Sequence, residues 1–234
     1  METLGLVFKV LWAPGEAMLL VSKKPRVLVP LILLTLVSLG VGISTFSKID
    51  IGEIALRQAE QSGRADSMTQ EQKDQMLRGA RIFAPVVMAI TALAPVVIVT
   101  LATAIYFGIF TIIGREATFK TFYAVTVFAY LPLILRQAVA LIQVFTIPPS
   151  SLVPEDLGSL SLATFLDPTT VSRAAYAAAT VVDITSIWIV ILLIIGYKFV
   201  VRKSVGPGLR VAGVVGVFLF FSLIAVGLRM LQAR

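Results

Sequence analysis

The sequence predicts an all-α integral membrane protein, a five-transmembrane-helix bundle with N-terminal interfacial amphipathic helices and a helical first outer loop. The first observation is composition, because 58% of the residues are hydrophobic and only 14% are charged, against about 25% charged residues in soluble domains. The second is that the apolar residues gather in runs long enough to cross a hydrocarbon core about 30 Å thick. We therefore expect an interfacial segment over 1–26 and a membrane domain over 27–234.

The segment 1–26 contains two short apolar patches, 4–12 and 17–21, separated by Pro14 and Gly15. Neither patch is long enough to span a bilayer. A tryptophan, Trp12, ends the first patch, and the basic residues Lys23, Lys24 and Arg26 follow the second. This pattern predicts helices that lie in the lipid head-group layer. Ordinary surface helices packed on the bundle are the alternative.

Five apolar segments predict membrane spans at about 27–47, 83–113, 122–147, 176–201 and 210–231. The stretch 82–114 is uncharged and would measure about 50 Å as a straight helix, which exceeds one bilayer core. It is too short for two spans and a turn, so we expect one long, tilted helix in which Pro85 and Pro95 permit kinks.

The polar loop 48–81 separates the first two spans. Apolar residues from Ile51 to Ala59 follow helical spacing, Gly63 is a plausible stop, and Thr69 with Gln72 fits a capping box. These signals predict a helical hairpin at the membrane surface. A solvated, partly helical charged loop is the alternative.

The distribution of Lys and Arg predicts a cytoplasmic N-terminus and a C-terminus outside. With this orientation the inner segments carry basic clusters around 23–26, 115–120 and 198–210, whereas the second outer loop carries Glu155, Asp156 and Asp167 against Arg173. A charged elbow over 114–120 connects the second and third spans on the inner side. The candidate inner-face contact surface is Lys23, Lys24, Arg26, Arg115, Glu116 and Lys120.

Two charged residues lie away from the ends of predicted spans, Arg136 in the third and Asp183 in the fourth. These spans are consecutive and antiparallel, and both residues are expected at similar depth. An unpaired charge at that depth costs several kcal/mol, so we expect an intramembrane charge pair, Arg136–Asp183. The pair could be a structural clamp or part of a proton or ion relay.

The residues for common catalytic chemistry are missing. The chain has no Cys and no His, which removes thiolate chemistry, Cys/His metal sites and an imidazole base. No nucleotide-binding loop, nucleophile elbow or zinc-protease motif occurs. We therefore expect no enzyme, no catalytic residue, no metal and no cofactor. The basic residues flank apolar runs instead of alternating with aromatic residues, so no nucleic-acid partner is expected.

Four stretches together are similar to one known family. They are APGEAMLLVSKKPR before the first span, GREATFKTFYAVTVFAYLPLIL from the elbow onward, SLATFLD in the second outer loop, and VDITSIW around Asp183. In their order and spacing they resemble the bacterial branch of the Yip family, named for eukaryotic relatives that interact with Ypt/Rab GTPases. The positions that carry the family motifs are Pro14, Gly114, Phe119, Tyr130, Pro132, Asp183 and Trp188.

The resemblance implies five helices, an inside N-terminus and a bacterial plasma (inner) membrane location. Eukaryotic relatives carry a longer polar cytosolic segment before the bundle with a tyrosine-containing motif, which residues 1–26 do not show, so GTPase binding is not carried over. Some bacterial relatives are thought to assist ABC-type export systems or envelope-stress defence. The expected partners are the lipid bilayer and a membrane-protein partner or a second copy of the chain.

Three functions remain open from the sequence. The leading hypothesis is a non-enzymatic scaffold or accessory subunit of another membrane complex, related to ABC-type export or to envelope and membrane trafficking. The second is a small permease or channel that uses Arg136 and Asp183. The third is a lipid-handling or membrane-shaping protein, suggested by the Trp12 region and the overlong second helix.

Overall fold

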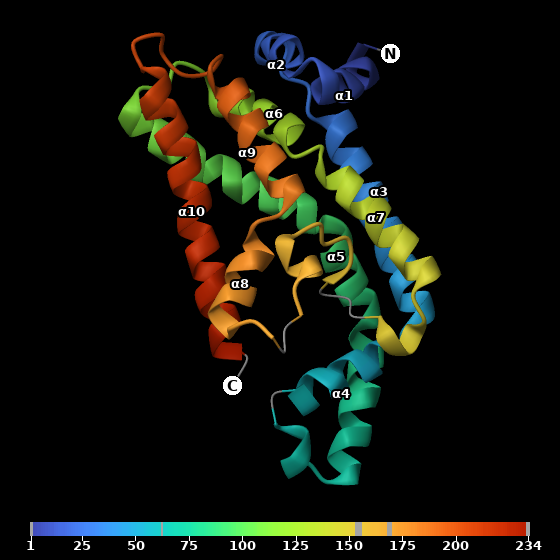
Figure 1. The fold of residues 1–234 in the computed structure, drawn as a ribbon. Coiled ribbons are helices and arrows are strands. Elements are labelled where there is room, and N and C mark those ends of the chain that lie inside the picture. Colours follow the sequence, from blue (N-terminus) through green and yellow to red (C-terminus); the bar gives the residue numbers. More distant parts are fainter. Residues whose placement is uncertain (1, 62, 153–155, 168–169, 233–234) are drawn as a thin grey trace.

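The protein is all-helical throughout the part of the chain that the structure describes. The computed structural model describes residues 2–61, 63–152, 156–167 and 170–232. Figure 1 shows an elongated molecule with the two N-terminal helices at one end, called here the α1/α2 end, and α4 at the other. The α-helices are α1 (Glu2–Trp12), α2 (Pro14–Lys23), α3 (Leu28–Lys48), α4 (Ile51–Gln61), α5 (Gln70–Ile113), α6 (Phe119–Ala129), α7 (Leu133–Thr146), α8 (Arg173–Val181), α9 (Ile184–Tyr197) and α10 (Pro207–Gln232).

Four helical segments among the described residues are long and apolar enough to cross a membrane. They are Leu28–Lys48, Gln70–Ile113, Phe119–Thr146 and Pro207–Gly227. The third combines α6 and α7, which are separated by a short turn at Tyr130–Pro132 where the proline begins α7. Together with the composition, these segments make the chain an integral membrane protein.

The helix predicted over 176–201 is divided in two. Helix α8 ends at Val181 and α9 begins at Ile184, with Asp183 between them as the N-cap of α9. The 14 residues of α9 measure about 21 Å, less than a bilayer core. The fourth predicted span is therefore a short apolar helix preceded by a separate helix, rather than one continuous helix.

Helix α5 continues without interruption through Pro85 and Pro95, as the prediction of one long helix required. At 44 residues it measures about 66 Å, and Figure 1 shows that it bends between its start beside α4 and its end beside α6. Proline removes one backbone hydrogen bond of the helix ladder, which permits such a bend.

The polar loop forms the helical hairpin that the sequence predicted. Helix α4 packs on the first turns of α5, and the Arg81 Nε atom lies 2.8 Å from Asp50 Oδ2. The capping box is confirmed, since the Thr69 N–H donates to Gln72 Oε1 over 2.8 Å and the Gln72 N–H donates to Thr69 Oγ1 over 3.3 Å. Gly63, with φ at +67°, follows the end of α4.

The hydrophobic core lies at the α1/α2 end. Its centre is the fully buried ring of Tyr197, which is surrounded at centroid distances of 5.2–5.3 Å by the rings of Tyr106, Phe110 and Phe122. The Tyr197 hydroxyl lies 2.9 Å from Thr126 Oγ1, so its polar atom is paired inside the core. Helices α5, α6 and α9 meet at this cluster.

The N-terminal helices are part of this core. Val10 of α1 and Ala17 and Met18 of α2 are fully buried against it. On the opposite face, Phe8 and Trp12 are 57% and 69% exposed, which suits contact with lipid. One face of these helices therefore packs on the bundle and the other remains apolar and exposed, while their placement in the lipid head-group layer stays a prediction.

Candidate binding pocket

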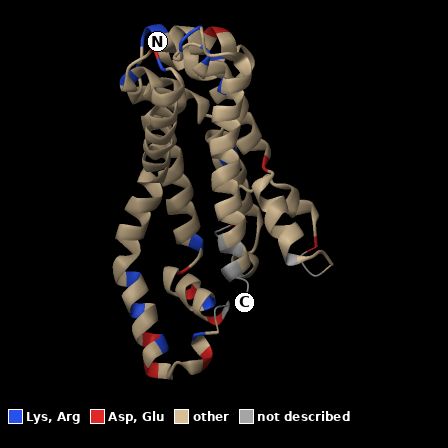
Figure 2. Ribbon diagram, turned by 90° about the vertical axis from the view of Figure 1, so that its left-hand side faces the viewer, with Lys and Arg blue, Asp and Glu red and all other residues tan. Residues whose placement is uncertain are grey.

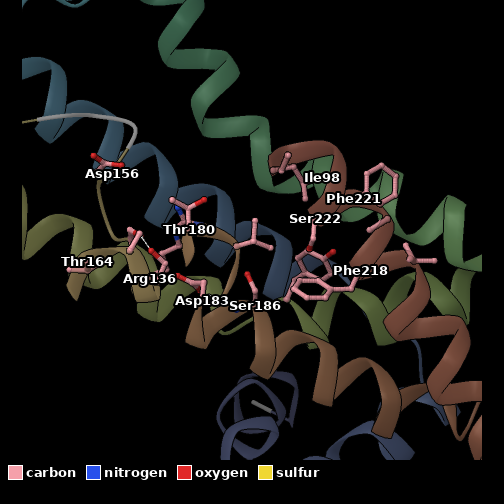
Figure 3. A pocket seen from close by; sticks show the side chains of 18 of the residues that line it. Ile98, Arg136, Asp156, Thr164, Thr180, Asp183, Ser186, Phe218, Phe221 and Ser222 are labelled. Atoms are coloured by element: carbon pink, nitrogen blue, oxygen red, sulfur yellow. Dashed lines mark hydrogen bonds between the residues drawn. The ribbon is translucent and has the colours of Figure 1, made fainter. Parts of the chain in front are cut away.

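A large pocket lies in the other half of the membrane domain, away from the α1/α2 end. We call this half the distal half; it contains the second parts of α7 and α10, helix α8 and the loop 156–167. The cavity measures about 720 Å³ and is shown in Figure 3. Residues of α5, α7, α8, α9, α10 and the loop line it. Its polar lining includes Tyr130, Arg136, Gln143, Asp156, Ser159, Ser161, Thr164, Tyr176, Thr180, Asp183, Ser186 and Ser222.

The Asp183 side chain accepts hydrogen bonds from backbone N–H groups at the start of α9. It is 5% exposed, and its Oδ1 atom accepts from the N–H groups of Thr185 and Ser186 at 2.8 and 3.1 Å. Its Oδ2 atom accepts from the Leu160 N–H at 3.0 Å. Asp is a strongly preferred N-cap because its carboxylate satisfies the first free N–H groups of a helix. The carboxylate therefore fixes α9 and the loop together.

The loop is held against α7 and α9 by several backbone contacts. The Leu162 N–H donates to Val182 O over 3.0 Å, beside the isolated bridge between Ser161 and Asp183. Gly158 adopts a φ of +70°, and a side chain there would collide with the Arg136 carbonyl oxygen. Its N–H donates to Gln143 Oε1 over 2.6 Å. The loop thus forms a fixed wall of the pocket.

Arg136 and Asp183 line the same pocket, as their predicted depths suggested, but the described residues include no ion pair between them. The Asp183 carboxylate instead accepts three backbone N–H groups. The half-buried Arg136 side chain makes no ion pair or hydrogen bond with any residue in the described ranges. Its guanidinium is available to the cavity.

The opposite wall of the pocket is apolar. Ile98, Leu101 and Ile105 of α5 line it at helical spacing, as do Val217, Phe218, Phe221 and Ala225 of α10. Ile98, Leu101 and Phe221 are also 50%, 59% and 46% exposed. Residues that both line a cavity and remain exposed mark an opening, so the pocket has one apolar opening between α5 and α10, besides the exposed loop residues Asp156, Thr164 and Leu166 on its polar side.

Sequence reasoning identified Arg136 and Asp183 but missed the other polar residues of the pocket. One signal was present, because Gln143 lies seven residues after Arg136 and therefore on the same face of α7. Ser186 likewise follows Asp183 by three residues in α9. The loop residues Ser159 and Ser161 gave no comparable signal, since only the fold brings a loop to a pocket.

The candidate inner-face residues lie at the α1/α2 end. Lys23, Lys24, Arg26, Glu116 and Lys120 are exposed there, and Figure 2 shows several basic residues around this end. Arg115 is partly buried, and its guanidinium lies 4.6 Å from the centre of the Phe107 ring, so it is a packing residue as much as a surface one.

The elbow that carries three of these residues is fixed by the backbone. The N–H groups of Glu116 and Ala117 both donate to Val200 O at 3.1 Å, and the Arg202 N–H donates to Gly114 O at 3.0 Å. Gly114 has a φ of +136°, and a Cβ there would lie 3.0 Å from Val205. The elbow and the segment after α9 thus form one short paired unit.

Glu16 of α2 and Lys9 of α1 form an ion pair at this end. The Glu16 carboxylate lies 2.6 Å from Lys9 Nζ, and this hydrogen bond and charge lower the pKa of Glu16 below its ordinary value. The pair connects α1 with α2 across the turn at Pro14.

Most family-motif positions coincide with helix ends. Pro14 begins α2, Gly114 caps α5, Phe119 begins α6, Tyr130 ends it, Pro132 precedes α7 and Asp183 caps α9. Trp188 is the exception, since it lies inside α9 and packs against the core. These residues thus determine where helices start and stop. Among the described residues, no group of three or more acidic side chains could hold a metal ion.

Comparison with known proteins identifies one relationship. Neither the curated proteins nor the solved structures that were searched contain a match. The family model of the Yip1 domain matches residues 8–227, which include every helix from α2 to α9, the last residues of α1 and most of α10. This chain therefore belongs to the Yip1 domain family.

Proposed function

We propose that this protein is a non-enzymatic scaffold or accessory subunit of another complex in a bacterial inner membrane, of the ABC-type export or envelope class. We place the N-terminus in the cytoplasm, following the distribution of Lys and Arg. The partner is a membrane protein with an acidic cytoplasmic surface, and the docking surface is Lys23, Lys24, Arg26, Arg115, Glu116 and Lys120.

The main support for this proposal is that exposed basic side chains lie on a rigid end of the molecule. Lys23 ends α2 and Lys24 follows it, and the α2 residues Ala17 and Met18 are fully buried in the core. Lys120 ends the elbow, which is fixed by backbone hydrogen bonds to Val200. A rigid charged surface loses little entropy when it binds, and complementary charge favours encounter with an acidic partner.

The test is to identify by mass spectrometry the proteins that remain with the full chain after mild-detergent extraction from native membranes. We expect a stoichiometric membrane-protein partner that is lost when Lys23→Glu and Lys24→Glu are combined. The control combines Lys73→Glu and Arg78→Glu, which reverses two charges near α4 at the far end. Retention of the partner by the first variant, or equal loss with both, would remove the docking surface.

A small permease or channel is the second candidate, and the pocket favours it because Arg136 and Asp183 line one cavity. Between this cavity and the α1/α2 end lies the aromatic cluster around Tyr197, which is fully buried. Transport therefore requires a second conformation in which this cluster opens, whereas a scaffold requires none. Solute flux into proteoliposomes that Arg136→Ala abolishes would favour the permease over the scaffold.

A further inference from the structure

We propose that the pocket of the distal half is a binding site for one zwitterionic phospholipid. In this site Arg136 binds the lipid phosphate, Asp156 faces the terminal amine, and the acyl chains leave between α5 and α10. The site is independent of the docking surface proposed above, since it lies in the other half of the molecule.

The size and opening of the cavity suit such a ligand. Its volume of about 720 Å³ falls within the range of pockets that bury small organic ligands, about 300–1,000 Å³. The exposed apolar residues at its mouth face the hydrocarbon region of a bilayer. A lipid can therefore enter sideways and keep the ends of its acyl chains in the membrane.

Arg136 supplies the group that selects a phosphate. A guanidinium presents several N–H donors in a planar arrangement that matches phosphate oxygens. Within the described residues it has no ion-pair partner, and an intramembrane charge without a partner costs several kcal/mol. A bound phosphate would provide the missing counter-charge. The hydroxyls of Tyr130 and Thr164 line the same cavity and can donate to the remaining oxygens.

The two carboxylates of the pocket play different parts. Asp183 is occupied by three backbone N–H groups, and the positive end of the α9 dipole offsets its charge. Asp156 also lines the pocket but is exposed. One basic group with one uncommitted acidic group matches a zwitterionic head group better than a purely anionic one.

The order of these groups in space matches the order of groups in the lipid. Figure 3 shows Asp156 at one side of the pocket, Arg136 and Asp183 next, and Ile98, Phe218 and Phe221 at the other side. A phospholipid likewise has an amine, then a phosphate, then acyl chains. Polarity therefore decreases in one direction along both the pocket and the ligand.

The first experiment measures binding of three probes to the full chain in detergent by native mass spectrometry. The probes are phosphatidylethanolamine, diacylglycerol with the same acyl chains, and soluble phosphoethanolamine. We expect a one-to-one complex with the phospholipid and about tenfold or weaker binding of the other two, because each lacks one half of the contacts. If diacylglycerol binds as tightly as phosphatidylethanolamine, the head group does not contribute to binding. If soluble phosphoethanolamine binds as tightly, the acyl chains do not contribute and the ligand is not a lipid.

The second experiment changes each half of the site separately. Arg136→Gln is expected to weaken phospholipid binding about tenfold or more, the loss of one charge-assisted contact. Arg202→Gln removes an exposed charge at the other end and should bind as the unchanged protein does. Ser222→Trp fills the cavity beside the apolar wall and should also abolish binding, whereas Ser222→Ala should not.

A third variant makes the test independent of whether Arg136→Gln folds. Asp156→Asn changes an exposed side chain and is expected to reduce the preference for phosphatidylethanolamine over anionic phosphatidylglycerol. Binding that Ser222→Trp leaves unchanged, or a preference that Asp156→Asn leaves unchanged, would overturn the assignment of this pocket.

Discussion

The α1/α2 end and the distal half of this membrane domain contain parts of the same long helices but are packed in different ways. At the α1/α2 end, α2, α5, α6 and α9 surround a fully buried tyrosine, Tyr197. In the distal half, the walls contributed by α5 and α10 enclose a cavity of about 720 Å³, and a loop with α8 fills part of the space. Figure 1 shows α10 and the pair α3–α7 on opposite sides of that region.

The difference follows from where helices approach closely and where they break. Gly196 lets α9 pack directly on α6, since a Cβ there would lie 2.5 Å from Val125. At its other end α9 stops at Asp183, well short of a full span. Close packing at one end therefore stabilises the fold, and the early break at the other leaves room for a pocket.

The largest expected effect on stability comes from adding a side chain at Gly196, where α9 packs closely on α6. Gly196→Val places carbon atoms inside contact distance of Val125 and Met18, so α9 must move away from α6 and α2. Overpacking of this kind costs about 3 kcal/mol. We expect a marked fall in the apparent melting temperature of the protein in mild detergent.

Gly216→Val is the matched control for this change. A Cβ at Gly216 meets nothing within 4 Å, and the residue lies in the middle of α10. The melting temperature of the Gly216→Val protein should remain close to that of the unchanged protein. If both variants melt alike, close approach at Gly196 does not determine the packing of the α1/α2 end.

The next effect in size comes from Asp183 in the distal half. Asp183→Ala removes the α9 cap and leaves the partly buried Leu160 N–H without its acceptor, at a combined cost of about 2 kcal/mol. We expect faster hydrogen exchange and proteolysis in the loop 156–167 before any change at the α1/α2 end. Asp183→Asn, which keeps a good cap, should cost less.

The same site tests the charge pair predicted from the sequence. Since Asp183 binds backbone N–H groups, Arg136→Gln and Asp183→Asn should have nearly additive effects on stability, with a coupling below about 0.5 kcal/mol. A larger coupling in this double-mutant cycle would mean that the two charges interact in the membrane. Reversing both charges together should accordingly recover no more expression than either single reversal.

A smaller effect is expected for the hydroxyl at the centre of the core. Tyr197→Phe removes the contact with Thr126 Oγ1, but that hydroxyl still donates to Phe122 O over 2.8 Å. No buried donor is orphaned, so the loss is about 1 kcal/mol. The control is Tyr123→Phe, which removes the exposed contact with Thr100 and should change the melting temperature less. Equal effects would show that burial of the Tyr197 hydroxyl contributes nothing.

Local signals in the sequence were sufficient for much of the fold. The capping box at Thr69 and the uninterrupted helix through Pro85 and Pro95 each depend on neighbouring residues or on run length. The break before α9 also had a local signal, Asp183 as an N-cap, but the surrounding apolar residues suggested one span. Length of an apolar run alone does not show whether the helix is continuous.

The pocket depended on contacts between residues far apart in the sequence. Gly158 packs on Arg136 and bonds to Gln143, and the Leu160 N–H satisfies Asp183. Neither of these long-range contacts follows from helical or strand spacing in the sequence. The sequence could therefore suggest that Arg136 and Asp183 share a depth and bring these two charges to one part of the fold, but it could not predict which groups surround them.

The smallest expected effect concerns the surface of the α1/α2 end, where Lys9 lowers the pKa of Glu16. A depressed carboxyl pKa stabilises the folded state above the unfolded pKa, whose ordinary value is 4.5, and this contribution disappears as the pH falls through the folded pKa. We therefore expect Glu16→Gln to lower the melting temperature slightly at pH 7 and not at all at pH 3. Because Glu16 is largely exposed, solvent screens the pair and the change in melting temperature should be small.

Glu116→Gln, at the same end, is the control, since the Glu116 carboxylate makes no ion pair with the described residues. A Glu16→Gln effect that persists unchanged at pH 3 would show that the ion pair with Lys9 is not the source of that effect.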